Sequence, residues 1–254
     1  MILRRAFLFA TLWFSFALRL TAEPAWPQST FAEADFLFVP LRFHLLSATN
    51  LDLVHTTLVP TDIERILGKM NRIWAQAGIH FYAESILRED ARYRPELDEA
   101  VRQNDRQGLL ALRPDQSMGT NFLHIYYLKK MAVNGIHFRE ANFVKDTAAL
   151  RPVEGGIDEP LPRVSSHELG HAFGLPHRQN TTNLMASGTT GLWLNEEEIK
   201  IARGIAGKMP WTESVAIINQ RLKDAPSGKE AAHSKVWRER LAEIAFLLKG
   251  RKNE

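Results

Sequence analysis

The chain contains no cysteine among its 254 residues. No disulfide can therefore cross-link it, and its stability has to come from a buried hydrophobic core and from any metal that it binds. A large excess of one charge is missing too, because 32 Lys and Arg stand against 29 Asp and Glu. The chain is long enough for one large domain, or one domain with a helical appendage.

Long hydrophobic runs are also lacking. The apolar run near the N-terminus covers residues 6–17, which is too short to cross a bilayer comfortably. It follows Arg4 and Arg5 and precedes Leu20-Thr21-Ala22, the order of an export signal. We therefore predict a signal peptide over residues 1–22, read by the secretory or the twin-arginine route. A membrane anchor, left by a signal that is not cleaved, is the alternative.

Removing that signal changes the charge of the protein. Arg4, Arg5 and Arg19 leave with it, so the formal net charge falls from +3 to zero. The mature chain then has no basic excess that would favour nucleic acid or anionic lipid as a partner. We expect a secreted or periplasmic protein with no stable membrane span after cleavage and no nucleic-acid partner.

Histidine is scarce, yet three of the nine histidines fall within one short segment, HELGHAFGLPH, from His167 to His177. His167 and His171 are one helical turn apart, so both rings leave the same face, about 6 Å apart along the axis. Two neutral imidazoles at that spacing can share one tetrahedral Zn²⁺. Glu168 is the next residue round the helix, where a general base must lie to take a proton from a metal-activated water.

The residues after His171 provide a way to bring in the third ring. Gly174 can adopt left-handed backbone angles and end the helix, and Pro176 discourages any continuation. His177 can then approach from a loop and leave a fourth position open, as a catalytic zinc site requires. Three imidazoles also suit copper, nickel or iron, so zinc is the expected ion and not the only chemically possible one.

This segment resembles the zinc signature of the metzincin metallopeptidases. Their second hallmark is a methionine turn, and Met185 lies in NLMASG with a His-to-Met spacing similar to that of the matrixin branch. The resemblance implies that Met185 forms an apolar floor beneath the three histidines without binding metal. Ser187 stands where some branches carry a tyrosine ligand, so a fifth ligand is not implied. Without cysteine, a cysteine-switch pro-peptide is excluded.

The alternation of patterns along the chain predicts an α+β fold. The resemblance implies a metzincin-like domain with a twisted, mostly parallel sheet of about five strands, an antiparallel edge strand and an active-site helix, to which the pattern adds a helical C-terminal part. The expected strands are 36–46, 79–87, 121–128, 131–138 and 142–144; the expected helices are 61–76, 96–104, 163–173, from about 195, 212–223 and 229–249.

Several positions within these elements have a specific interpretation. Pro40 points to an edge strand or a bulge, and Thr61 with Glu64 fits a capping box. Ser165 with Glu168 fits a capping box as well, which would engage Glu168 with the backbone. His80 is expected to be a partly buried or rim histidine and not a ligand. Trp193 is either on the rim of the pocket on the leaving-group side or in the core.

The edge strand has its own predicted role. In metzincins an edge strand above the cleft pairs with extended substrate, and chain order assigns that role to residues 132–137. Gly135 could instead mark a bulge.

The predicted organisation is a signal peptide (1–22), a lead-in (23–33), a metallopeptidase catalytic domain (34–208) and a C-terminal helical extension (209–254). The expected function is that of an exported zinc endopeptidase with one catalytic Zn²⁺, held by His167, His171 and His177, and with Glu168 as general base. Its partner would be a protein or peptide substrate. The alternatives are a hydrolase with one narrow target, a non-catalytic envelope binding module pinned by zinc, and a scaffold acting through its C-terminal helices.

Overall fold

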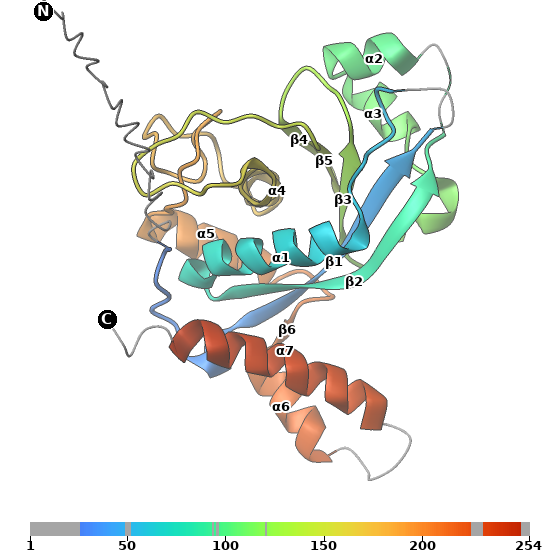
Figure 1. Ribbon diagram of the computed structural model, residues 1–254. Helices are drawn as coiled ribbons and strands as arrows, with labels where there is room; N and C mark the ends of the chain where they lie inside the picture. Colours follow the sequence, from blue (N-terminus) through green and yellow to red (C-terminus); the bar gives the residue numbers. More distant parts are fainter. Residues whose placement is uncertain are drawn as a thin grey trace, which may run out of the picture.

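The computed structural model describes residues 26–48, 52–92, 94, 97–119, 121–224 and 231–249 (Figure 1). The predicted signal peptide lies outside these residues. Within them, no helix is both long and apolar enough to cross a membrane.

A mixed sheet forms the centre of the molecule. Its strands are β1 (Leu37–Ser47), β2 (Ile79–Asp90), β3 (Leu123–Leu128), β4 (Gly135–Phe138), β5 (Ala141–Lys145) and β6 (Glu213–Ser214). The order is β2-β1-β3-β5-β4, parallel throughout except that β4 runs antiparallel to β5 at the edge. The short β6 pairs antiparallel with the start of β1. The predicted α+β fold with a mostly parallel sheet and an antiparallel edge strand is therefore confirmed.

Strand β1 shows how the sheet accommodates Pro40. β1 lies between β2 and β3, so the edge-strand interpretation of Pro40 is wrong. The register with β2 shifts between Leu41 and Arg42, next to the proline, as the bulge interpretation predicts. Pairing with β3 begins only at Leu41, so the missing N–H of Pro40 falls outside that ladder.

Two helices cover one face of the sheet: α1 (Pro60–Trp74) and α4 (Pro160–Ala172) (Figure 1). Their apolar sides bury alternate residues of β1 in the main core, among them Leu41 and Phe43. The core face predicted for α1 is confirmed, and all of its members are buried except Leu67, which is partly buried: Ile63, Ile66, Leu67, Met70, Ile73 and Trp74.

The ends of α1 differ in part from the prediction. The helix begins at Pro60, and the Asp62 carboxylate accepts a hydrogen bond from the Val59 N–H at 2.9 Å. The predicted capping box of Thr61 and Glu64 is therefore wrong, because proline at the first helical position moves the start one residue earlier. A 3-10 turn, Ala75–Ala77, follows the helix, and Gly78 ends it at φ +58° as predicted.

A small helical unit covers one end of the opposite face. Where a single short helix was expected near residues 96–104, the chain forms α2 (Leu97–Gln103), α3 (Arg106–Ala111) and a 3-10 turn (Asp115–Ser117). The second helix arises because the Asp105 carboxylate caps it, accepting from the Gly108 N–H at 2.8 Å. These helices bury apolar side chains against β1, β3 and β5 in a second core cluster.

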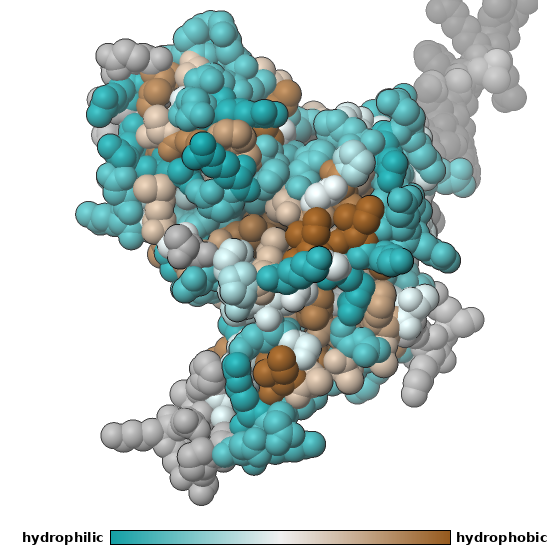
Figure 2. Space-filling model, turned by 180° about the vertical axis from the view of Figure 1, so that it is seen from behind, coloured by the Kyte–Doolittle hydropathy of each residue, from teal (hydrophilic) through white to brown (hydrophobic). Residues whose placement is uncertain are grey.

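The C-terminal helices α6 (Val215–Asp224) and α7 (Ala231–Lys249) cover the other end of that face. They pack on Phe36 and Phe38 in a third core cluster, so they belong to the packed body of the protein. His80 is almost completely buried beneath α7, and its Nε2 lies 3.0 Å from Glu243 Oε2. These two helices lie at the bottom of Figure 2, where hydrophilic residues surround a hydrophobic spot.

Between these two helical units, the sheet carries a buried pair of histidines. His44 Nε2 and His124 Nδ1 are 2.9 Å apart, and His44 Nδ1 lies 2.5 Å from Glu89 Oε2. The ring of His44 stacks on Tyr126 at 4.1 Å. Burial lowers the pKa of His44 to about 2, and the charges of His124, Arg42 and Arg113 act in the same direction. Burial lowers the pKa of His124 as well.

This pair predicts acid sensitivity. Unfolded histidines bind protons below about pH 6.5 while His44 stays neutral in the folded state, so stability is lost as the pH falls below that value. His44 should contribute a slope of about 1.4 kcal/mol per pH unit, and the lowered pKa of His124 acts in the same direction. Urea unfolding between pH 7 and 5 should therefore show a smaller loss for His44→Gln than for the wild type. His55→Gln, at an exposed histidine, should keep the wild-type slope. Equal slopes in all three proteins would contradict this assignment.

Candidate metal centre and cleft

Helix α4 carries two of the three histidines of the signature. It begins at Pro160, three residues before the predicted start, because Pro160 and Pro162 both lie in its first turn and proline is pre-shaped for that position. Ser165 is consequently inside the helix, where its hydroxyl is 2.8 Å from that of Tyr127. The alternative in which Ser165 and Glu168 form a capping box is therefore wrong.

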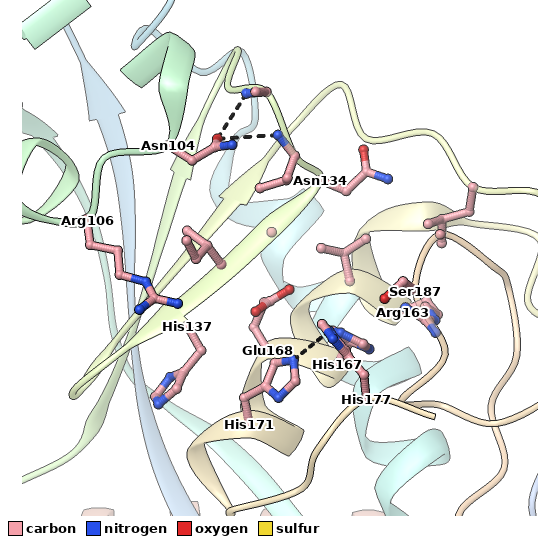
Figure 3. Close-up of a pocket in the computed structure, with 17 residues that line it drawn as sticks. Asn104, Arg106, Asn134, His137, Arg163, His167, Glu168, His171, His177 and Ser187 are labelled. Atoms are coloured by element: carbon pink, nitrogen blue, oxygen red, sulfur yellow. Dashed lines mark hydrogen bonds between the residues drawn. The ribbon is translucent and has the colours of Figure 1, made fainter. Parts of the chain in front are cut away.

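The structure brings together the three histidines that the sequence singled out (Figure 3). One nitrogen from each of His167, His171 and His177 can be chosen so that all three lie within 4.8 Å of one another. Gly174, at φ +79°, ends the helix and turns the chain so that His177 approaches from the following loop. The Nε2 atoms of His171 and His177 are 3.1 Å apart. This group can hold a metal ion.

The backbone orients two of the rings for that purpose. His167 Nδ1–H donates to the Leu184 carbonyl and His171 Nδ1–H to the Leu175 carbonyl, each at 2.8 Å. Both Nε2 atoms are then unprotonated and available as ligands. Burial lowers the pKa of His167 to about 3 and also lowers that of His171, which keeps the imidazoles in the neutral form that binds metal. The donor set therefore fits a zinc ion.

The loop after His177 packs Met185 against the helix that carries His167 and His171. Met185 is completely buried, and a Cβ atom on Gly170 would overlap its sulfur, so Met185 lies against α4 between the turns of His167 and His171. Asn183 fixes the turn by accepting the Met185 N–H at 2.6 Å and donating to Glu198 at 2.8 Å.

Glu198 is a residue that the sequence analysis missed. It is completely buried in helix α5 (Glu196–Ala206), where it forms a capping box with Asn195 and an ion pair with Arg178 at 2.5 Å. It thereby links α5 to both ends of the loop between His177 and Met185. The pattern Asn195-x-x-Glu198 was the signal that could have identified it.

Glu168 lies next to His167 on the cleft side of α4 and is only 4% exposed (Figure 3). Burial raises the pKa of its carboxyl to about 8, opposed by the charge of Arg163 and a hydrogen bond from the His137 backbone. Strand β4 passes very close to it, because a Cβ atom on Gly135 would lie 2.5 Å from Glu168 Oε1. Gly135 pairs regularly with Val144, so it permits this close approach and the bulge interpretation is wrong.

A cleft of about 690 Å³ opens in front of these groups. One wall is β4 and the segment before it, and the other is α4 with the loop at Ser187 and Gly188. Asn104, at φ +55°, holds the first wall by accepting the N–H groups of Ala132 at 3.0 Å and Val133 at 3.3 Å. The sequence gave no reason to single out Asn104, Arg106 or Arg163, which also line the cleft.

Trp193 occupies neither of its two expected positions. Its side chain is 41% exposed, so it is not a core residue, and it does not line this cleft. It lines a separate depression of about 260 Å³ together with Arg178 and Asn180. The Trp193 N–H and carbonyl bond to Thr182 and Leu184, which fixes the chain here while leaving the ring at the surface.

No protein-family model matches the chain, and neither does any curated protein. Among solved structures it is similar to archaemetzincin from Methanopyrus kandleri, with 14% identity over 67% of this chain and 97% of that one and a TM-score of 0.44. It is also similar to a zinc-dependent peptidase from Methanocorpusculum labreanum, with 13% identity over 66% of this chain and 99% of that one and a TM-score of 0.32. A third similar structure is metalloproteinase-II from Bacteroides fragilis, with 12% identity over 72% of this chain and 57% of that one and a TM-score of 0.36.

Proposed function

We propose that this protein is a zinc-dependent endopeptidase. The observation that carries the proposal is a metal-binding trio, His167, His171 and His177, beside the Glu168 carboxyl on the wall of an open cleft. Three imidazoles with a cleft in front are the arrangement of a catalytic zinc site, whereas a structural zinc has its four positions closed by protein. The cleft thus favours catalysis over a binding module that is only pinned by zinc.

The chemistry follows from the residues around the cleft. A bound Zn²⁺ supplies Lewis acidity, which polarises a peptide carbonyl and lowers the pKa of water to about 7. Glu168 accepts the proton of the attacking water and passes it to the departing amine. Its position suits this role, because Glu168 lies next to His167 on the wall of the cleft.

Strand β4 is suited to hold the substrate. One of its edges pairs with β5, and no strand among the described residues pairs with its other edge, which can therefore accept an additional strand. Its residues Gly135, Ile136 and His137 line the cleft. An extended peptide can add to this edge by backbone hydrogen bonds, which places one of its peptide bonds beside Glu168.

We also propose that the protein is exported and works in the periplasm or outside the cell. The support is the order of residues 1–22, with an arginine pair, an apolar run and small residues at the end.

Metal removal tests the proposed activity. The purified protein should contain about one zinc per chain and cleave members of a proteome-derived peptide library or casein. A chelator should abolish that cleavage, and stoichiometric Zn²⁺ should restore it, because no other group on the cleft can replace the Lewis acid. Mass spectrometry of the products and elemental analysis of the protein measure both. Cleavage that is unchanged by the chelator would overturn the proposal, and zinc without cleavage of any peptide would favour the binding module.

A further inference from the structure

A buried arginine lies beside the metal centre, and among the described residues no carboxylate forms a direct ion pair with it. Arg163 is 2% exposed and lies one helical turn before His167 in α4. Its Nε donates to the Gly191 carbonyl at 3.3 Å, and its Nη2 donates to the Ala186 carbonyl. Among the residues that the structure describes, no Asp or Glu oxygen lies within 4.0 Å of its guanidinium.

An unpaired buried cation is unfavourable, so its presence calls for an explanation. Burial lowers the pKa of Arg163 to about 10, opposed by the charge of Glu168, and this still leaves the guanidinium charged at neutral pH. The two carbonyls satisfy donors on Nε and Nη2 but do not neutralise the charge. The guanidinium has five N–H donors, so donors remain for an anion that arrives from the cleft.

The surroundings of Arg163 form one end of the cleft. Figure 3 places Arg163 next to Ser187 at this end, beyond His167 as seen from Glu168. The cleft is also lined by the apolar Leu150 and Val164 and by Gly188. The walls are small or apolar, and the charged group is the guanidinium. Of the described residues that line the whole cleft, Glu168 is the single carboxylate, whereas Arg163 and the exposed Arg106 are both cationic.

We infer that Arg163 determines specificity by binding an acidic side chain of the substrate, so that preferred cleavage sites carry Asp or Glu next to the scissile bond. This inference rests on the proposed function and narrows it to a substrate class. A carboxylate entering this end of the cleft meets a guanidinium with free donors and a low-polarity wall, where a charge-assisted hydrogen bond is strong. An apolar side chain would leave the cation buried and unpaired.

Arg163 also has a competing structural explanation. Its two carbonyl contacts connect α4 to the loop after Met185, so it could serve only to hold that loop in place. A purely structural role predicts equal losses for all substrates when Arg163 is replaced. A specificity role predicts losses that depend on the charge of one substrate residue, and the experiment separates the two.

The first arm needs only the wild-type protein. Peptides with a single cleavage site are varied at each of the two residues on either side of the bond, in matched pairs of Asp and Asn or of Glu and Gln. At one position the acidic member should have a kcat/KM about 10- to 100-fold higher, the effect of one charged hydrogen bond. If the kcat/KM values of the two members of every pair lie within about twofold of each other at all positions, the inference is overturned. The peptidase assignment would remain intact.

The second arm uses two arginine variants on opposite sides of the cleft. Arg163→Met should reduce the acid-to-amide ratio of kcat/KM to near one, whereas Arg106→Met, the matched control, should retain the preference at that position. An equal fall of kcat/KM for the acidic and the amide peptide in Arg163→Met would instead assign Arg163 to the structural role.

The third arm measures binding without turnover. Glu168→Ala lacks the proposed base, so the Kd of labelled acidic and amide peptides can be compared by fluorescence anisotropy. The acidic peptide should bind at least about 10-fold more tightly, and Arg163→Met in that background should remove the difference. Equal Kd values would overturn the inference. If the wild type cleaves no peptide but the acidic one binds selectively, the peptidase proposal fails and the acid-binding site stands.

Discussion

Replacing Glu168 with alanine should reduce kcat/KM for peptide hydrolysis about 10²- to 10⁴-fold, the usual contribution of a general base. The variant should still bind one zinc, because the three histidines keep their backbone partners and do not depend on Glu168. The fold should also be retained, since removing a buried carboxyl removes a desolvation cost. Peptide kinetics, elemental analysis and thermal unfolding measure these three properties.

A matched control lies at the start of the same helix. Glu159 flanks α4 at its N-terminus, outside the cleft, and forms surface ion pairs with Arg65 and with Lys69, the latter at 2.9 Å. Glu159→Ala should therefore lose little stability and keep near-wild-type kinetics. If Glu168→Ala hydrolysed peptides at the wild-type rate, the assignment of Glu168 as the base would be wrong. If it lost its zinc, the loss of activity would not identify a base at all.

The metal centre was predictable because its geometry is mostly local. Three of its features depend on short stretches of chain: the one-turn spacing of His167 and His171, the left-handed turn at Gly174, and the position of Glu168 one residue after the first histidine. Helix α1 and its termination at Gly78 were predictable for the same reason, since helix periodicity and glycine at a helix end act over a few residues.

The rest of the site depends on contacts between segments far apart in the sequence. Gly135 is required because β4 passes against Glu168, and Asn104 matters because it holds the segment before β4. Arg163 looks like an ordinary helix-surface arginine until the loop after Met185 folds over it. The partner of such a residue cannot be read from spacing, since spacing carries no information on which distant backbone will cover a side chain.

The C-terminal helices present the same problem on the other face of the sheet. An apolar stripe on 229–249 left two possibilities open: packing on the catalytic domain, or a surface for a partner. In the structure Trp237 of α7 packs on Phe38 of β1 with ring centroids 5.3 Å apart and on Tyr82 of β2 at 5.5 Å. Trp237 is only 7% exposed, so α7 contributes to the core that stabilises β1 and β2.

Trp237→Ala should therefore reduce the free energy of unfolding of the whole protein by about 3–5 kcal/mol, the range for truncating a buried aromatic side chain. Phe246→Ala is the matched control, because Phe246 is an aromatic residue of the same helix that is 77% exposed. Its replacement should change the free energy by no more than about 0.5 kcal/mol. Urea unfolding, monitored by a circular dichroism signal that does not depend on tryptophan, measures the free energy of unfolding of both variants. If Trp237→Ala shows a single transition at a lower urea concentration, α7 unfolds together with the sheet. If α7 were only attached to the surface, it would unfold separately and the main transition would stay in place.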